Sequence, residues 1–213
     1  MADTARDFYV RHHEGSTGFR RYGFTYGDRT RIEWFRAKVG VGGRVLDIGC
    51  RDGTLTAEYA PGNRVTGVDI DDVALGLARE RLGIETVQAN LNVGGLPLAD
   101  GSFDVVVMGE VLEHLQFPTV VVDEVLRVLA PDGRFVGSVP NAFRLKNRLT
   151  FLLGREYETD PTHLHQFSPS GLARCLSGFA TVELDFLGGR YRRLSPELFG
   201  SDMVFCARRG TSA

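Results

Sequence analysis

Three ionisable side chains lie close together in the segment GEVLEHL, residues 109–115. Glu110, Glu113 and His114 have the spacing i, i+3 and i+4, which places side chains on one face of a helix. Two carboxylates and an imidazole could bind a divalent metal ion or transfer protons. They could equally form the solvated face of an ordinary helix, so the choice depends on the surrounding elements.

Two further acidic residues stand at the ends of short apolar runs. Asp47 ends the run RVLDI, and Asp69 lies 22 residues later in RVTGVDI. Gly49 and Gly53 follow the first run and permit a tight turn. The G-x-G-x-x-G pattern of dinucleotide sites is absent, and a carboxylate at this turn would repel phosphate but attract a cation. A carboxylate in the position of Asp69 can accept hydrogen bonds from both hydroxyls of a ribose.

Strands and helices are expected to alternate along the chain. Apolar runs predict strands at 44–48, 64–70, 84–89, 103–108 and 133–139, and helical patterns fall at 26–39, 54–60, 71–82 and 119–129. Residues 180–188 and 201–209 predict two more strands. We therefore expect an α/β fold with a doubly wound, Rossmann-like sheet of about seven strands, mostly parallel with an antiparallel C-terminal hairpin. Its ligand crevice would lie at the carboxyl ends of the parallel strands.

The length and composition indicate one globular domain spanning 1–213. Its expected parts are N-terminal cap helices (1–40), a cofactor-binding core (41–139), a substrate lid or loop (140–167), and a C-terminal helix and hairpin (168–213). The net charge of −2 gives no general attraction to nucleic acid. Three scattered cysteines without a CxxC pair argue against a disulfide framework or a cysteine-built zinc site. Without a signal-like segment or a membrane-length apolar run, we expect a cytoplasmic protein.

Four segments occur in a recognisable order: VLDIGCRDG (45–53), GVDI (67–70), LPLADGSFDVVVMGEVLEHL (96–115) and LRVLAPDGRFVGSVPN (126–141). Together they resemble the class I S-adenosylmethionine-dependent methyltransferases. This cofactor has an ammonium, a sulfonium and a ribose diol but no phosphate, which suits Asp47 and Asp69. Arg51 departs from the pattern, because family members often have glycine there. The cofactor contacts expected in this core are Asp47, Gly49, Cys50, Gly53 and Asp69, with Asn90 at the adenine edge and Ile70 and Leu91 as apolar walls.

EVLEH sharpens the resemblance to two groups, the ubiquinone-biosynthesis O-methyltransferases and the small-RNA 2′-O-methyltransferases. The first group implies an arginine that grips the methionine carboxylate at Arg29, and a cofactor contact at Gly109.

In both groups the triplet Glu110, Glu113 and His114 resembles a divalent-metal site. The RNA enzymes imply a fourth ligand at His165, with His163 as the neighbouring alternative. Carboxylates and imidazoles suit magnesium, manganese or zinc. The alternative is a metal-free site, in which Glu110 lies by the cofactor and His114 packs the following segment or acts as a base.

The expected function is S-adenosylmethionine-dependent O-methylation of a small molecule, either with or without a metal ion, with His114 and Glu110 as catalytic residues. The alternatives are an RNA ribose 2′-O-methyltransferase, a small-molecule N- or carboxyl methyltransferase, and a non-catalytic cofactor-binding partner. The ubiquinone enzymes have a membrane-contacting insertion near 140–156, so that segment predicts a peripheral membrane contact, a lid or a dimer contact. The oligomeric state stays open.

Overall fold

The computed structural model describes residues 2–13, 22–23, 29–157 and 160–210. Its helices are α1 (Ala2–His13), α2 (Arg29–Val39), α3 (Asp72–Leu82), α4 (Pro118–Val128), α5 (Leu145–Leu152), α6 (Pro169–Cys175) and α7 (Pro196–Phe199). Two 3₁₀ turns are η2 (Thr56–Glu58) and η3 (Leu112–His114). The strands are β1 (Arg44–Ile48), β2 (Arg64–Asp69), β3 (Glu85–Gln88), β4 (Phe103–Gly109), β5 (Leu129–Pro140), β6 (Thr181–Leu187) and β7 (Asp202–Arg208).

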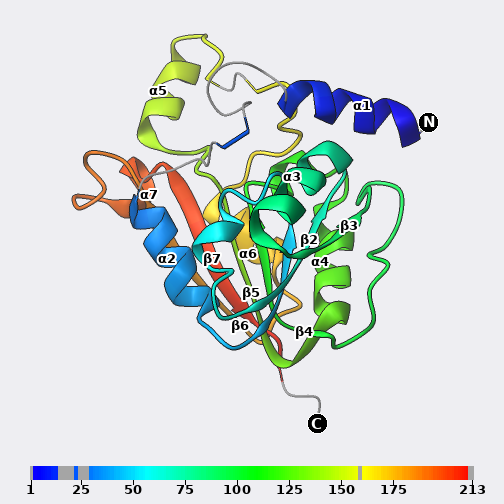
Figure 1. The fold of residues 1–213 in the computed structure, drawn as a ribbon. Coiled ribbons are helices and arrows are strands. Elements are labelled where there is room, and N and C mark those ends of the chain that lie inside the picture. Colours follow the sequence, from blue (N-terminus) through cyan, green and yellow to red (C-terminus); the bar gives the residue numbers. More distant parts are fainter. Residues whose placement is uncertain (1, 14–21, 24–28, 158–159, 211–213) are drawn as a thin grey trace.

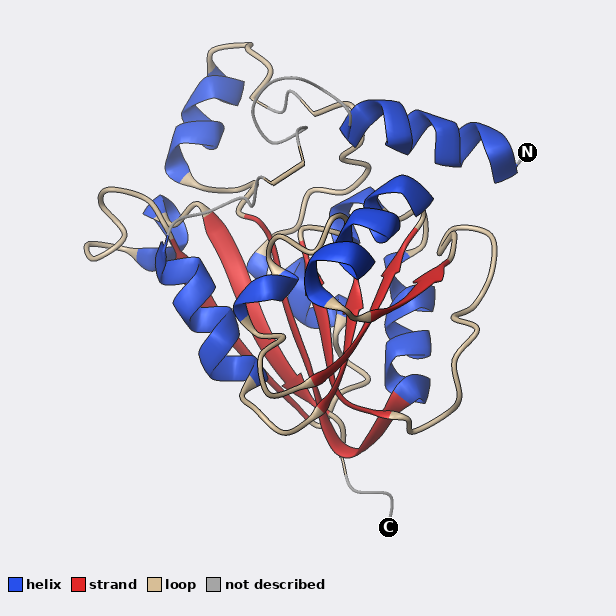
Figure 2. Cartoon of the chain, in the orientation of Figure 1, coloured by secondary structure: helices blue, strands red, loops and turns tan. Residues whose placement is uncertain are grey.

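The strands form one seven-stranded sheet in the order β3-β2-β1-β4-β5-β7-β6. β1 to β5 pair in parallel, and β7 runs antiparallel to both of its neighbours. Figure 2 shows this sheet as one twisted layer between helices. The doubly wound, mostly parallel sheet with an antiparallel C-terminal hairpin is therefore confirmed.

Alternate residues of β4 serve the two faces of the sheet. Val105 and Val107 belong to a buried cluster that includes Phe35 of α2. Val106 and Met108 belong to a second cluster, which includes apolar residues of α4 and α6. Both faces are thus covered, which explains why the strands are almost continuously apolar.

Capping residues account for the ends of α3. Asp71 is its N-cap, and the Asp71 carboxylate accepts a hydrogen bond from the backbone nitrogen of Ala74. Gly83 closes the helix in the left-handed conformation, with φ at 64°. α4 similarly starts at Pro118, whose fixed φ suits a first helical turn.

One sequence expectation is wrong and two need a further detail. The helix expected at 54–60 is only the 3₁₀ turn η2, and the lid segment 140–167 contains the helix α5. The first core helix is seen from Arg29, and residues 26–28 lie outside the described residues. In the described ranges, every helix is too short or too polar to span a bilayer.

Two helices lie beyond the sheet on the side of its carboxyl strand ends. Figure 1 shows α1 and α5 above the upper end of the sheet, opposite the C-terminus. α1 is held there by two contacts with the start of α3. Arg6 pairs with Asp72 at 2.7 Å, and His13 Nδ1 lies 2.8 Å from Asp71 Oδ2. Side chains of both helices line a space over the strand ends.

Candidate functional site

A cavity of about 430 Å³ occupies this space. That volume is typical of small-molecule sites. Its walls come from the carboxyl ends of β1 to β5, from α1 and α2, and from the chain between 140 and 163. Ten of the residues singled out from the sequence line it: Asp47, Gly49, Cys50, Asp69, Ile70, Asn90, Leu91, Gly109, Glu110 and His114. Four others do not: Arg29, Gly53, Glu113 and His165.

Asp47 is buried at the floor of the cavity. Thr56 and Tyr59 both donate hydrogen bonds to its Oδ2, at 2.5 and 2.7 Å. Burial raises the pKa of Asp47 to about 6, although the two hydrogen bonds act in the opposite direction. A buried carboxylate of this kind gains from a nearby cation.

Asp69 lies at the end of β2, buried beside Asp47. Its two carboxylate oxygens accept hydrogen bonds from the backbone nitrogens of Arg51 and Asp71, at 2.9 and 3.0 Å. Burial raises the pKa of Asp69, and these bonds partly counter the effect. Arg51 has φ at 48°, the left-handed conformation that glycine adopts most easily. This explains why glycine suits that position, while the Arg51 amide that binds Asp69 does not depend on the side chain.

The two turn glycines have different roles. Gly49 has φ at 77°, and a Cβ there would lie 2.3 Å from a methyl of Val111. Gly49 therefore lets the turn pass close to the end of β4. Gly53, with φ at 72°, faces Leu82 and Ala78 of α3 and does not line the cavity. Its position indicates packing of the turn against a helix.

Glu110 does not share a helical turn with Glu113 and His114. Its φ is 58°, and only Leu112–His114 form the 3₁₀ turn η3. The Glu110 carboxylate accepts a hydrogen bond of 2.6 Å from Ser138, and it lies 3.6 Å from Nη2 of Arg31. The left-handed backbone conformation at Glu110 directs its side chain toward Ser138 of β5, so it does not join Glu113.

Arg31, and not Arg29, faces the cavity. Arg31 is 2% exposed, lines the cavity and donates a 2.8 Å hydrogen bond to Ser138. The Arg29 side chain is 90% exposed and pairs with Glu33 one helical turn later. Residues two apart on a helix point to nearly opposite sides, so only one of the two arginines can face inward.

A compact cluster of Glu113, His114 and His163 lies beside the end of β4. One ligand atom from each lies within 4.8 Å of the other two. Nδ1 of His114 is 3.1 Å from the carbonyl of Thr162, which can only accept a hydrogen bond. In the neutral ring the proton is therefore on Nδ1, and the Nε2 lone pair faces Glu113. Burial, with a smaller contribution from the nearby His163, lowers the pKa of His114 to about 4, so the ring is neutral at pH 7.

His163, rather than His165, joins this cluster. The backbone nitrogens of Leu164 and His165 both donate to the carbonyl of Glu113, at 2.8 and 3.0 Å. These bonds hold the 162–165 segment against η3. The His163 ring packs edge-on against His114, with centroids 4.7 Å apart. Nε2 of His165 instead lies 3.4 Å from the carbonyl of Gln116, outside the cavity.

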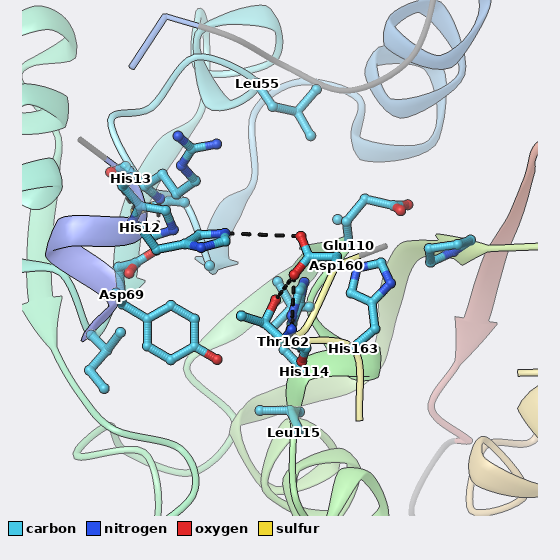
Figure 3. Close-up of a pocket in the computed structure, with 18 of the residues that line it drawn as sticks. His12, His13, Leu55, Asp69, Glu110, His114, Leu115, Asp160, Thr162 and His163 are labelled. Atoms are coloured by element: carbon cyan, nitrogen blue, oxygen red, sulfur yellow. Dashed lines mark hydrogen bonds and ion pairs between the residues drawn. The ribbon is translucent and has the colours of Figure 1, made fainter. Parts of the chain in front are cut away.

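The N-terminal helix adds residues that the sequence analysis did not identify. Tyr9, His12 and His13 of α1 line the cavity. Nε2 of His12 lies 4.0 Å from Oδ2 of Asp160, and Figure 3 shows the two side chains facing each other near His114 and His163. Burial acts to raise the pKa of Asp160, but hydrogen bonds from Thr162 prevail and lower it. The adjacent histidines at 12 and 13 are the sequence feature from which a functional role of α1 could be predicted.

Comparison with known proteins shows which family the chain resembles. Residues 46–137 match the family model described as "Methyltransferase domain". The chain is 35% identical, over 68% of its length, to a probable S-adenosylmethionine-dependent methyltransferase of Mycolicibacterium smegmatis. It is 34% identical, over 78% of its length, to a ubiquinone biosynthesis O-methyltransferase of Aromatoleum aromaticum. The matches cover 54% of the first relative and 75% of the second, so the chain spans about half the length of the first.

Solved structures share the fold. A S-adenosylmethionine-dependent methyltransferase from Archaeoglobus fulgidus superposes with a TM-score of 0.68 at 21% identity, covering 84% of this chain and 92% of that one. The N-methyltransferase NodS of Bradyrhizobium japonicum, solved with S-adenosyl-L-homocysteine, gives 0.65 at 18% identity, covering 96% and 97%. At these identities the likeness concerns the fold alone.

Proposed function

Because the chain belongs to the S-adenosylmethionine-dependent methyltransferases, we propose that it transfers the methyl group of S-adenosylmethionine to a hydroxyl oxygen of a small molecule. One observation carries the proposal: a single cavity has buried carboxylates at the ends of β1 and β2, and neutral imidazole beside the end of β4. Methyl transfer from a sulfonium is a direct displacement, so much of the catalysis is alignment. An oxygen nucleophile must also lose a proton, which imidazole can accept.

The cofactor would occupy the part of the cavity over β1, β2 and β3. Asp69 would accept hydrogen bonds from the two ribose hydroxyls, while Asp47 offers negative charge to the cationic end. Ile70 and Leu91 would contact the adenine faces, and Asn90 its edge. Gly49, Cys50 and Gly109 would contact the cofactor along the strand ends.

Arg31 would bind the carboxylate of the methionine moiety. Its guanidinium is oriented by Ser138 and Glu110, so an anion could bind it without ordering a long side chain. We expect Arg31→Gln to weaken S-adenosylmethionine binding about 20-fold, the loss of one charge-assisted contact. Arg29→Gln is the matched control and should change the Kd less than twofold. Titration calorimetry measures both, and equal effects of the two variants would contradict the assignment.

The acceptor would bind over the ends of β4 and β5, next to His114. The His114 Nε2 lone pair is free of the carbonyl of Thr162, so it can accept the hydroxyl proton. Glu110 is engaged by Ser138 and Arg31, which suits positioning of the cofactor end better than proton transfer. His114 is therefore the proposed base of the metal-free form of this function.

A divalent metal would use the same cluster. Glu113, His114 and His163 supply one carboxylate and two imidazoles, a donor set that fits zinc or manganese and leaves positions for acceptor oxygens. When bound, such an ion would lower the pKa of the acceptor hydroxyl. The group of ligand atoms within 4.8 Å of one another does not include Glu110 or His165. Within this proposal, His163 replaces His165 as the second imidazole.

Contact with a membrane surface stays a prediction for residues 140–156. α5 has no buried residue, and Leu149, Phe151 and Leu152 are exposed on it beside Lys146 and Arg148. Apolar side chains flanked by cations are typical of interfacial helices. A lid or a dimer contact would use the same side chains. Cosedimentation with anionic vesicles, compared between the wild type and Phe151→Ser, distinguishes membrane contact from the other two alternatives.

A further inference from the structure

The part of the cavity over β5 has a polar wall that the cofactor assignments do not use. Pro140, Asn141, Arg144, Asn147 and Ser201 line it. If the cofactor lies over β1, β2 and β3, this wall faces the acceptor. The inference that follows therefore rests on the proposed function.

The wall is anchored to the sheet through Asn141. This buried side chain donates hydrogen bonds to the carbonyls of Glu197 and Gly200, at 2.8 and 3.0 Å. The Asn141 backbone nitrogen donates to the carbonyl of Ser201 at 2.9 Å. These bonds join the end of β5 to the start of β7 and fix Ser201 beside the cavity.

Arg144 is held on this anchored wall by neutral groups. Its Nε donates to Asn147 Oδ1 and its Nη1 to Ser201 Oγ, both at 3.2 Å. Asn147 is in turn fixed by a 3.0 Å hydrogen bond to the carbonyl of Ala142. A guanidinium has five N–H donors, so these two bonds orient it and leave donors for a ligand.

The charge of Arg144 is not matched within the described ranges. There, no carboxylate forms an ion pair with Arg144, whereas Arg31, which also lines the cavity, has Glu110 at 3.6 Å. A half-buried cation gains more from an anion than a solvated one does, because screening is weaker. Its planar fork also matches a carboxylate with two parallel hydrogen bonds.

We propose that Arg144 forms a carboxylate subsite, and that the acceptor is a small hydroxylated carboxylic acid. The carboxylate binds Arg144 at the end of β5, and the hydroxyl points toward His114 at the end of β4. Asp160 and Glu110 line the cavity near His114 and His163, so their negative charge disfavours the reverse orientation, with the carboxylate at His114. Arg144 is then a specificity-determining residue, since it selects acids over neutral alcohols of the same shape.

Matched pairs of probes test this subsite. We would titrate 3,4-dihydroxybenzoate against catechol, and 4-hydroxybenzoate against phenol, into protein saturated with S-adenosylhomocysteine. At least one acid should bind tenfold or more tightly than its neutral counterpart. Arg144→Gln should abolish that preference and Arg144→Lys should retain part of it. Arg148→Gln is the control, because Arg148 lies outside the cavity and donates to the carbonyl of Phe143.

Each other outcome contradicts a defined statement. Equal affinities within both pairs, or a preference that persists in Arg144→Gln, would overturn the subsite. Loss of S-adenosylhomocysteine binding in Arg144→Gln and Arg144→Lys, with both variants folded by circular dichroism, would assign Arg144 to the cofactor and overturn it as well. Failure of the wild type to bind S-adenosylmethionine would instead refute the proposed function. Cofactor binding without a carboxylate preference leaves that function intact.

Discussion

Replacing Asp69 with alanine is expected to weaken S-adenosylmethionine binding by roughly 100-fold or more. A carboxylate that accepts from two ribose hydroxyls makes two hydrogen bonds to a charged group, each worth about 1.5–3 kcal/mol. Asp69 is buried at the end of β2, so water would not replace these bonds well. Titration calorimetry gives the change in Kd directly.

The substitution also removes the acceptor for the amides of Arg51 and Asp71, so the local turn could change. Adenosine and 2′-deoxyadenosine separate the two effects. The wild type should prefer adenosine, and Asp69→Ala should bind both nucleosides equally, because the preference depends on the carboxylate itself. Asp100→Ala is the control, since Asp100 is exposed, pairs with Arg127 and does not line the cavity. A ribose preference that survives in Asp69→Ala would show that another group binds the diol.

The second large effect is expected at His163. In metal-stripped protein, His163→Ala should weaken Mn²⁺ or Zn²⁺ binding by about 100-fold, because one ligand of the set is lost. Glu113→Gln should have a similar effect, while His165→Ala should change the Kd less than twofold. The two histidines are nearly adjacent in the chain, yet only His163 lies within 4.8 Å of the other candidate ligands.

Three results would be decisive for this cluster. If His165→Ala weakens metal binding and His163→Ala does not, the ligand set implied by the RNA enzymes is correct and His163 is not a metal ligand. If the wild type binds neither ion, the cluster is an acid–base element and His114 is the base. If all three variants bind normally, the metal site lies elsewhere.

The core of the site could be predicted from the sequence because it depends on strand ends. Each apolar run ends where the chain leaves the sheet, and parallel strands bring these ends to one edge. Asp47, Asp69 and Gly109 therefore line one cavity although they are far apart in the chain. Their chemical roles remain proposals.

The sequence also contains a pattern that predicts Arg31 as the inward-facing arginine of α2. Arg31, Phe35 and Val39 follow one another at intervals of four, and all three are buried. An arginine that extends an apolar stripe points inward, whereas Arg29 lies off that stripe. The arginine position implied by the family resemblance pointed instead to Arg29.

The choice between His163 and His165 could not be made from sequence. It depends on the backbone path after Asp160, which is set by hydrogen bonds from Leu164 and His165 to the carbonyl of Glu113. The place of α1 over the cavity could not be predicted for a similar reason, because it depends on contacts between segments far apart in the chain. His12 and His13 reach the cavity only because Arg6 and His13 contact the acidic start of α3.

The buried carboxylate of Asp47 has a consequence for the lifetime of the ligand-free chain. Its pKa is raised from 3.8 to about 6, so its contribution favours the folded state below pH 3.8 and is lost as the pH rises through 6. At neutral pH this corresponds to about 3 kcal/mol of destabilisation at most. Asp47→Asn should therefore raise the melting temperature at pH 7.5 more than at pH 5, and an unchanged difference would contradict this. A cationic cofactor would offset the same charge, so protein without cofactor would be the form that proteases degrade first.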